Sequence, residues 1–332
     1  VQTLTIEMVE CAQDAETLAR KLSFSQVQPQ SINTDCRPER MRAYVRMRPI
    51  GAEEPQSMMS VTDTACTFVI SKQTAQGSAV KEEHDFKFDG IFGPDATQSN
   101  VYETVMKPQV AAFLAGKDTL TFAHGITNAG KTHTIQGNDS PEGEGLIPRA
   151  LRAVYETLEE QRAQDNSTFQ LGASFMEIYG SDAYDLLAPT ERQTFWNAVA
   201  HGRTSLKIKT SADRVFVKGL KEVDLPDVNT ALAMVRMGWR NRQSASNGIN
   251  FDSSRSHAVL CIKLIHTSNE YPKGRVTRMH VVDLAGAERQ KNTQSTGTRL
   301  NEANHINKDL MVLGQCLRVL SCNQANPRGK QK

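Results

Sequence analysis

The stretch G-I-T-N-A-G-K-T at residues 125–132 constrains the fold more than any other part of the chain. It follows the apolar run at residues 119–123 and precedes the helix-permissive residues 131–134. Glycine and lysine in this spacing, between a strand and a helix, are typical of a loop whose backbone N–H groups turn toward phosphate oxygens. The pattern therefore predicts a phosphate-binding loop. The alternative is a glycine-rich surface turn with a solvated lysine.

Composition sets broad limits on the class of protein. With 332 residues, 39% of them hydrophobic, the chain can bury a sizeable core as one large α/β domain or two smaller ones. A net charge of +2 favours neither a nucleic-acid binder nor an acidic-surface protein. The six cysteines include no C-x-x-C pair, and no run approaches the length of a membrane span. We expect a cytosolic protein with reduced cysteines and no membrane or nucleic-acid partner.

The chain divides by character into an N-terminal extension, residues 1–40, and one domain over residues 41–332. The extension is rich in Gln, Ser and Thr, and its apolar residues recur at a spacing that favours a short amphipathic helix: Leu4, Met8, Cys11, Ala15, Leu18 and Leu22. Beyond it, patterns of period 2 predict strands at residues 43–49, 118–123, 169–179, 258–265 and 275–282, the last two forming a hairpin. Helices are expected at residues 145–164, 230–237 and 300–320.

Two further motifs bear on the phosphate loop. D-L-A-G-A-E at residues 283–288 ends a strand with an acidic residue that can hold Mg²⁺ through water, followed by a glycine whose N–H can approach a γ-phosphate. N-F-D-S-S-R-S-H at residues 250–257 places two hydroxyls beside an arginine, which suits a segment closing over a metal-bound phosphate. Alone, the first is equally a strand end with a turn, and the second a polar loop capping the hairpin.

Taken together with V-R-M-R-P at residues 45–49, these motifs closely resemble the kinesin motor domain in order and spacing. Shorter matches at residues 88–98, 175–187 and 304–310 extend the resemblance over about residues 41–320. It implies an α/β P-loop NTPase-type motor fold, a central mixed β-sheet flanked by helices on both faces. Within the family the chain is similar to the kinesin-6 group, and to its centralspindlin motor in particular. The features are the loop at residues 140–149, the helix at residues 310–320 and the asparagine in T-N-A-G-K-T.

The resemblance carries roles onto individual residues, with ATP and Mg²⁺ as the implied cofactors. The nucleotide-binding set is Arg46, Pro49, Gly125, Ile126, Thr127, Asn128, Ala129, Gly130, Lys131, Thr132 and His133. The implied metal-binding set is Thr132, Ser254 and Asp283. The implied catalytic set is Lys131, Ser253, Ser254, Arg255, Gly286 and Glu288. Arg46, Pro49 and His133 would frame the adenine, and Arg255 would pair with Glu288 to lock the closed loops. Glu288 would also relay a proton from the attacking water through a second water.

The resemblance also implies partners and a place of action. Residues 289–332 carry eight basic and two acidic side chains, so this part has a charge of plus six where the family docks on acidic tubulin. Lys291, Arg299, Lys308 and Arg318 are the candidate microtubule contacts, each equally readable as a solvated side chain. A plus-end-directed motor of the cytoskeleton is implied, acting at the spindle midzone and midbody in central spindle assembly and cytokinesis. It would dimerise through regions absent from this sequence and bind the GTPase-activating partner of centralspindlin.

Two other functions stay open on sequence grounds. A microtubule-binding crosslinker without ATP turnover would keep the basic segment but need no intact phosphate site. A P-loop enzyme unrelated to filaments would keep the phosphate site but need no match at residues 175–187 and 304–310. The sequence also ends at P-R-G-K-Q-K, before the family's last helices and neck linker, so force transmission and processivity are not addressed by it.

Overall fold

The computed structural model describes residues 3–10, 41–49, 59–73, 79–164, 167–188, 204–211, 214–246, 255–287 and 310–319. Ten strands among these form one mixed sheet, with β10-β9-β8-β14-β15-β7-β1-β2-β6 as its main path and β13 beside β8. The central strands are β8 (Thr168–Tyr179), β14 (His257–Thr267), β15 (Arg275–Asp283), β7 (Thr119–His124), β1 (Thr3–Glu10) and β2 (Arg42–Met47). The outer strands are β6 (Gly90–Phe92), β9 (Asp182–Asp185), β10 (Ser205–Leu206) and β13 (Val223–Asp224).

Alternating side chains of the central strands fill two separate cores, because successive residues of a strand face opposite sides of a sheet. One core contains Ala123, Leu260 and Val281, packed under the helices of that face. The other contains Phe122, Val259 and Val282, with Leu310, Leu313 and Leu317 packed against it. Helices therefore cover both faces of the sheet, which confirms the predicted fold class.

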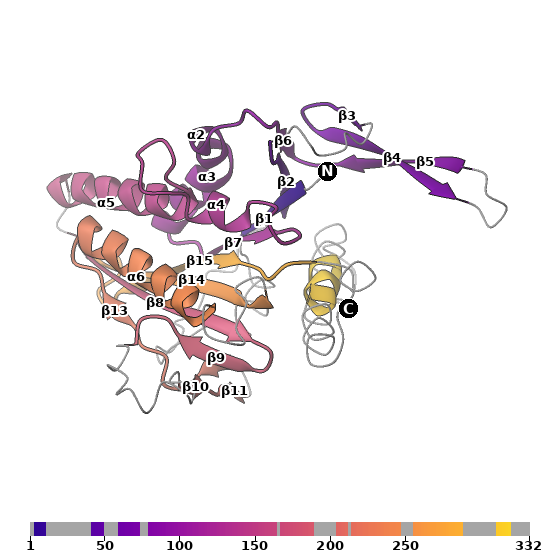
Figure 1. The fold of residues 1–332 in the computed structure, drawn as a ribbon. Helices are drawn as coiled ribbons and strands as arrows, with labels where there is room; N and C mark the ends of the chain where they lie inside the picture. Colours follow the sequence, from indigo (N-terminus) through magenta and orange to yellow (C-terminus); the bar gives the residue numbers. More distant parts are fainter. Residues whose placement is uncertain are drawn as a thin grey trace.

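The helices of the first face are α2 (Gln98–Val101), η1 (Tyr102–Met106), α3 (Lys107–Leu114), α4 (Lys131–Ile135), α5 (Leu146–Gln164) and α6 (Val228–Ser246). Helices α5 and α6 run side by side in Figure 1 and contact each other. Residues 310–319 are helical and lie apart from them, near the end of β15. The predicted helices at 145–164 and 230–237 are confirmed, while 300–309 and 320 of the third lie outside the described residues.

The predicted strands and hairpin are confirmed as β2, β7, β8, β14 and β15, with β14 antiparallel to β15 from Ala258↔Asp283 to His266↔Arg275. Two smaller sheets lie outside the main one. The first consists of β3 (Met59–Val61), β4 (Ala65–Gln73) and β5 (Ala79–Lys87), and the second of β11 (Ile208–Ser211) and β12 (Arg214–Val217). In Figure 1 the β4–β5 hairpin projects away from the body of the domain.

The amphipathic helix predicted near the N-terminus is wrong over residues 3–10, which form β1. This strand is antiparallel to both neighbours, pairing Leu4 with Arg46 in β2 and Ile6 with Ala123 in β7. Two long neighbouring strands supply backbone partners that a solitary helix would lack, so tertiary pairing overrides the local spacing. The remaining residues of the predicted helix lie outside the described ranges. The domain boundary at residue 40 stays a prediction, although part of the expected extension is a strand of the central sheet.

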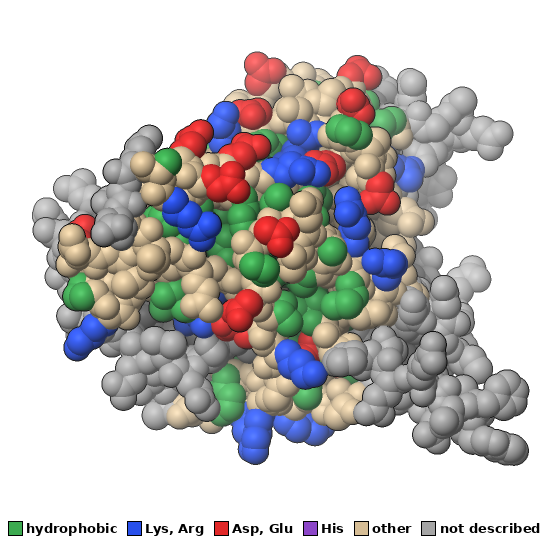
Figure 2. Space-filling model, turned by 90° about the vertical axis from the view of Figure 1, so that its left-hand side faces the viewer, with side chains coloured by type: hydrophobic (Ala, Val, Ile, Leu, Met, Phe, Trp, Pro, Cys, Tyr) green, Lys and Arg blue, Asp and Glu red, His purple; other side chains and the backbone are tan. Residues whose placement is uncertain are grey.

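Charges of both signs are mixed over the face that Figure 2 presents. Lysines and arginines alternate there with aspartates and glutamates around small apolar areas, in keeping with the near-zero net charge. Across the described ranges, no helix combines the length and apolar character needed to cross a membrane.

Candidate nucleotide-binding site

The glycine-rich stretch lies where the sequence places it, between the buried strand β7 and helix α4. Its backbone is in the left-handed region at Asn128, with φ 62°, and at Gly130, with φ 98°. A Cβ at Gly130 would meet nothing within 4 Å, so the glycine serves the backbone conformation and leaves the space above it open. The Lys131 ammonium donates to the carbonyl oxygens of Gly125 (2.8 Å) and Ile126 (2.9 Å). The Lys131 side chain therefore links the end of the loop to its first two residues.

Strand β15 brings the predicted acidic residue to this loop. Because β15 and β7 are parallel, with Asp283 opposite Ala123, both carboxyl ends meet at the loop. The Thr132 hydroxyl donates to Asp283 Oδ2 over 2.7 Å. Asp283 is 2% exposed, and its Oδ1 has no hydrogen-bond partner among the described residues. A buried carboxylate oxygen without a partner, beside a hydroxyl, fits the shell of a Mg²⁺ ion.

Arg242 is one of the site residues that the sequence did not predict. It is 3% exposed on α6, and its Nη1 donates to Asp283 Oδ2 over 2.8 Å while Nη2 donates to the Ser256 carbonyl. Its Nε lies 3.8 Å from Glu177 Oε1. A signal was present in the sequence, because Leu232, Val235, Trp239 and Arg242 recur at helical spacing, which puts the arginine on the buried stripe of α6.

The segment that follows Asp283 is tied to the phosphate loop and to β14. The Leu284 N–H donates to the Ala123 carbonyl and the Ala287 N–H to the Gly125 carbonyl, each over 3.2 Å. Between them, the Ala285 N–H donates to His257 Nδ1 over 3.0 Å. Burial, with a smaller contribution from Arg242, lowers the pKa of His257 to about 4, so its ring is neutral and free to accept. Gly286, the predicted γ-phosphate sensor, is buried within this segment.

The residues predicted to frame a base come together around a cavity of about 480 Å³. It is lined by Arg46, Met47, Arg48, Pro49, Pro94, Ala96, Thr97, Gln98, Ala129, Gly130, His133, Thr134, Ser140, Glu142 and Gly143. The Arg46 guanidinium is already engaged, since Nη1 donates to Gln98 Oε1 and to Thr134 Oγ1, and Nη2 to the Ala96 carbonyl. Burial lowers the pKa of His133, and nearby Arg46 lowers it further. Arg46 and His133 therefore form walls of one cavity.

Several predicted residues are not placed by the structure. Those outside the described ranges are Ser253, Ser254, Glu288, Lys291, Arg299 and Lys308. Arg255 lies directly before β14, but the proposed partner Glu288 is among the undescribed residues. Arg318 is exposed on the helix at residues 310–319, whose Leu313 and Leu317 pack against the sheet.

The described residues contain no group of three or more His, Cys, Asp or Glu side chains that could hold a metal ion by themselves. Among the described residues, a divalent cation here would take its protein ligands from Thr132 and Asp283, with the rest of its shell left for phosphate, water and the predicted ligand Ser254, which lies outside these residues. That donor set is typical of Mg²⁺ at a nucleotide.

Comparison with known proteins identifies relatives. The family model described as "Kinesin motor domain" matches residues 46–330. Kinesin-like protein KIF15 is 34% identical over 289 residues in human and 33% over 290 in mouse, with 84% of this chain covered in each case. The Arabidopsis kinesin-like protein KIN-7D, mitochondrial, is 34% identical over 242 residues, with 72% of this chain covered. The chain spans about one fifth of the length of these relatives.

The fold of the chain is also similar to solved structures of kinesins. One, described as a fast kinesin, has a TM-score of 0.68 and 30% identity, covering 81% of this chain and 72% of its own. Another, described as kinesin 6, has a TM-score of 0.66 at 24% identity, covering 86% and 84%. At that identity, the second comparison supports the fold.

Proposed function

This chain belongs to the kinesin motor domain family, and on this premise we propose that it is an ATP-hydrolysing microtubule motor. One observation carries the proposal. The Thr132 hydroxyl of the phosphate loop donates to the Asp283 carboxylate of the neighbouring strand over 2.7 Å, and the segment that follows Asp283 is bonded to the same loop. In this arrangement the phosphate loop and the segment after Asp283 can both bind a metal–triphosphate, and both can lose their contacts when the terminal phosphate leaves.

The residues have distinct tasks in this mechanism. Lys131, now bonded to two loop carbonyls, would bind the β- and γ-phosphate oxygens, and the Thr132 hydroxyl would be a ligand of the metal. Mg²⁺, when bound, would supply neutralisation of phosphate charge. Asp283 would hold the water shell of the metal, and the Gly286 N–H would bind the γ-phosphate. Phosphoryl transfer requires positioning and charge compensation more than a nucleophilic side chain, and this site offers both.

The remaining catalytic assignments rest on the family motifs. Ser253 and Ser254 would bind the phosphate side of the ligand, with Ser254 as a metal ligand, and Arg255 would pair with Glu288 to hold the closed arrangement. Glu288 relays a proton from the attacking water through a second water. Loss of Arg255 or Glu288 should therefore slow hydrolysis more than it weakens nucleotide binding.

Hydrolysis is coupled to filament binding through the segment that follows Asp283. Leu284 is bonded to β7 and Ala287 to the phosphate loop, and the same chain continues to the helix at residues 310–319. A change at the γ-phosphate can thus bias a second element. Lys291, Arg299, Lys308 and Arg318 are the proposed contacts with the acidic microtubule surface, and this binding should weaken with added salt.

A finer proposal is membership of the kinesin-6 group, as the centralspindlin motor. It is supported by the loop at residues 140–149 and by the L-M-V-L-G-Q-C-L-R-V-L sequence at residues 310–320. It carries with it plus-end movement, dimerisation outside this sequence, a GTPase-activating partner, and action at the spindle midzone and midbody in cytokinesis. KIF15 matches over most of this chain, and its name gives no such group. Localisation of the tagged protein in dividing cells tests the finer proposal, and absence from the midzone would reject it.

Steady-state ATP hydrolysis, measured with and without polymerised tubulin, tests the motor proposal. We expect strong stimulation by microtubules, and near-complete loss of turnover in Lys131→Ala. Microtubule binding without turnover would support the alternative, an ATPase-deficient crosslinker. A turnover rate indifferent to filaments would support a P-loop enzyme of another kind.

A further inference from the structure

Gln98 connects three walls of the cavity beside the phosphate loop. It is 5% exposed at the start of α2, and its Oε1 accepts from Arg46 Nη1 over 2.7 Å. Its Nε2 donates to the His133 carbonyl over 2.6 Å and to the Gly143 carbonyl over 3.3 Å. One amide therefore holds β2, which is distant in sequence, against α4 and the loop at residues 136–145 that directly follows α4. Each contributes a lining residue to the same cavity.

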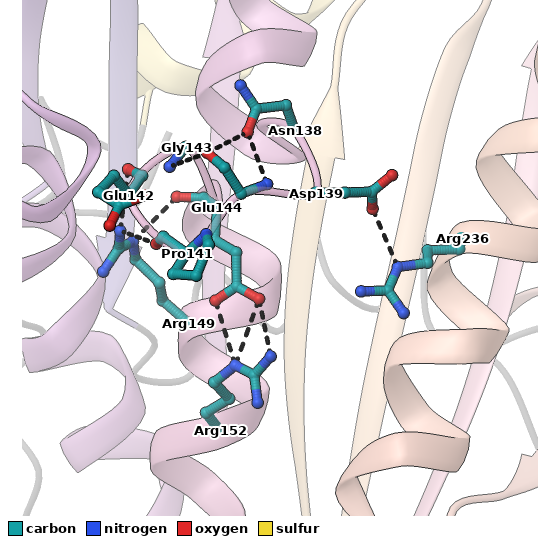
Figure 3. A network of polar contacts seen from close by, with 10 residues as sticks. Asn138, Asp139, Pro141, Glu142, Gly143, Glu144, Arg149, Arg152 and Arg236 are labelled. Carbon is teal, nitrogen blue, oxygen red and sulfur yellow. Dashed lines mark hydrogen bonds and ion pairs between the residues drawn. The ribbon is translucent and has the colours of Figure 1, made fainter.

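The loop at residues 136–145 is held firmly from its other side, as Figure 3 shows. Within it, the Asn138 N–H donates to the Gly143 carbonyl over 2.9 Å, and Gly143 donates to the Ser140 carbonyl over 3.0 Å. Asn138 Oδ1 also accepts from the N–H and hydroxyl of Ser140. A Cβ at Gly143 would lie 2.0 Å from Asn138 Oδ1, so a larger residue there would displace the Asn138 side chain from its bonds to Ser140. These internal hydrogen bonds fix the conformation of the loop where it lines the cavity.

Two arginines of α5 fasten this wall to the helix. Arg149 Nη2 donates to the carbonyls of Pro141 (2.9 Å) and Glu142 (3.2 Å), and Arg152 forms an ion pair with Glu144 at 2.8 Å. The inner end of the loop, at Gly143, instead bonds to Gln98. Gln98 therefore sets the distance between the loop and the opposite wall formed by Arg46.

We propose that Gln98 is the positioning residue of the base subsite, setting the separation of the walls that enclose a purine. This inference rests on the proposed nucleotide binding and deepens it. Gln98 does not contact the phosphate region, where Lys131 bonds to Gly125 and Ile126, and Thr132 to Asp283. Its influence should accordingly fall on the base and spare the phosphates.

The test compares two ligands that share phosphates and differ in the base. Binding of Mg·ATP and of inorganic tripolyphosphate with Mg²⁺ is measured by calorimetry on wild type and Gln98→Leu. Gln98→Leu removes one hydrogen bond from Arg46 and one from each of the His133 and Gly143 carbonyls, so we expect about a tenfold rise in the Kd for ATP. The Kd for tripolyphosphate should stay unchanged. A purely structural role would raise both constants together, and that result would overturn the proposal.

A matched control and a second variant keep the test decisive. Gln109 on α3 is 2% exposed and does not line the cavity, so Gln109→Leu should leave both constants unchanged. Gln98→Glu keeps the shape and the acceptor for Arg46 but turns an oxygen toward two carbonyls, and it should weaken ATP binding with the fold intact. ATP binding equal to wild type in both Gln98 variants would overturn the inference alone. Failure of the wild-type chain to bind either ligand would overturn the proposed function with it.

Discussion

The proposed nucleotide site is supported on the two sides of strand β7 by different kinds of contact. On the metal side, Asp283, Arg242 and Glu177 are charged groups that are 2–3% exposed, and Arg242 lies within 4 Å of both carboxylates as an ion pair. On the base side, the contacts of Gln98 and Arg46 go to amide, hydroxyl and carbonyl groups. One side is a network of buried charges, and on the other side the Arg46 guanidinium is bonded to neutral acceptors.

This difference indicates which side changes its contacts when a metal ion or a phosphate binds or leaves. Buried charges are stable only as a complete set, so a divalent cation or a γ-phosphate arriving beside Asp283 changes the balance for Arg242 and Glu177 as well. Neutral hydrogen bonds change little when a distant charge appears. We infer that the metal side transmits the state of the phosphates while the base side stays fixed and holds the ligand in register.

The two sides are also attached to β7 by different strands. The metal side joins through β15, which runs parallel to β7 and directly beside it. The base side joins through β1, because β2 carries Arg46 and pairs with β7 only by way of residues 3–10. The base side is thus attached to β7 through a strand from the N-terminal part of the sequence, β1.

The largest expected effect is at Arg242. Arg242→Ala leaves Asp283 and Glu177 buried without their cation, and it should lower the free energy of unfolding by about 3–5 kcal/mol. Arg240→Ala, on the exposed side of the same helix, is the matched control and should change it by less than about 0.5 kcal/mol. Urea unfolding without nucleotide measures both. Equal, small losses would mean that the metal side is not held by its charges.

Lowering the pH should reduce the stability of the protein mainly through the β15 side and less through the base side. Burial lowers the pKa of His280 on β15 to about 4, whereas an unfolded histidine titrates near 6.5. The unfolded state therefore binds more protons between these values, and stability should fall by about 3 kcal/mol as pH drops from 6.5 to 4.

Two variants assign this loss of stability to its source. His280→Asn should flatten the dependence of unfolding free energy on pH in that window by about one proton. His133→Asn, on the exposed base side, should flatten it less. Urea titrations at half-unit pH steps measure the slope. If the two variants have the same slope, the buried histidine is not the source.

A third prediction concerns β1 as the attachment of the base side. Ile6→Pro removes a backbone donor from a strand paired on both edges, and it should cost about 2–3 kcal/mol. Lys209→Pro in the two-stranded β11–β12 ribbon is the control and should cost less. Ile6→Pro should also weaken ATP binding more than tripolyphosphate binding. Equal weakening of ATP and tripolyphosphate binding would mean that β1 stabilises the whole site and not the base side in particular.

β1 also marks the limit of what sequence could predict. The phosphate loop, the Asp283 strand end and the β14–β15 hairpin follow from local patterns, because their residue types and spacing carry the signal within a few positions. The segment T-L-T-I-E-M-V-E alternates like a strand, yet its Leu4 and Met8 also fit a helix. Its pairing partners begin at residues 42 and 119, and nothing local decides between the two patterns.

The missed site residues share that property. Gln98 and Arg242 are polar side chains whose importance comes from partners 14 to 65 positions away, so neither stands in a recognisable motif. For Arg242 the helical stripe with Val235 and Trp239 gave a usable hint. For Gln98 the burial and the amide contacts appear only once α2, α4 and the loop at residues 136–145 are brought together.

The smallest predicted effect tests how far the base side is built from weak contacts. Arg152 is 45% exposed where it pairs with the 11% exposed Glu144, so Arg152→Ala should cost about 1 kcal/mol of stability. Lys107→Ala breaks the more exposed Lys107–Glu103 pair and should cost about 0.5 kcal/mol or less. Loosening the loop at Glu144 should raise the Kd for ATP by about two- to threefold through the wall at Gly143. A loss of several kcal/mol in Arg152→Ala would show that the base side, too, depends on charge, and the contrast between the two sides of β7 would disappear.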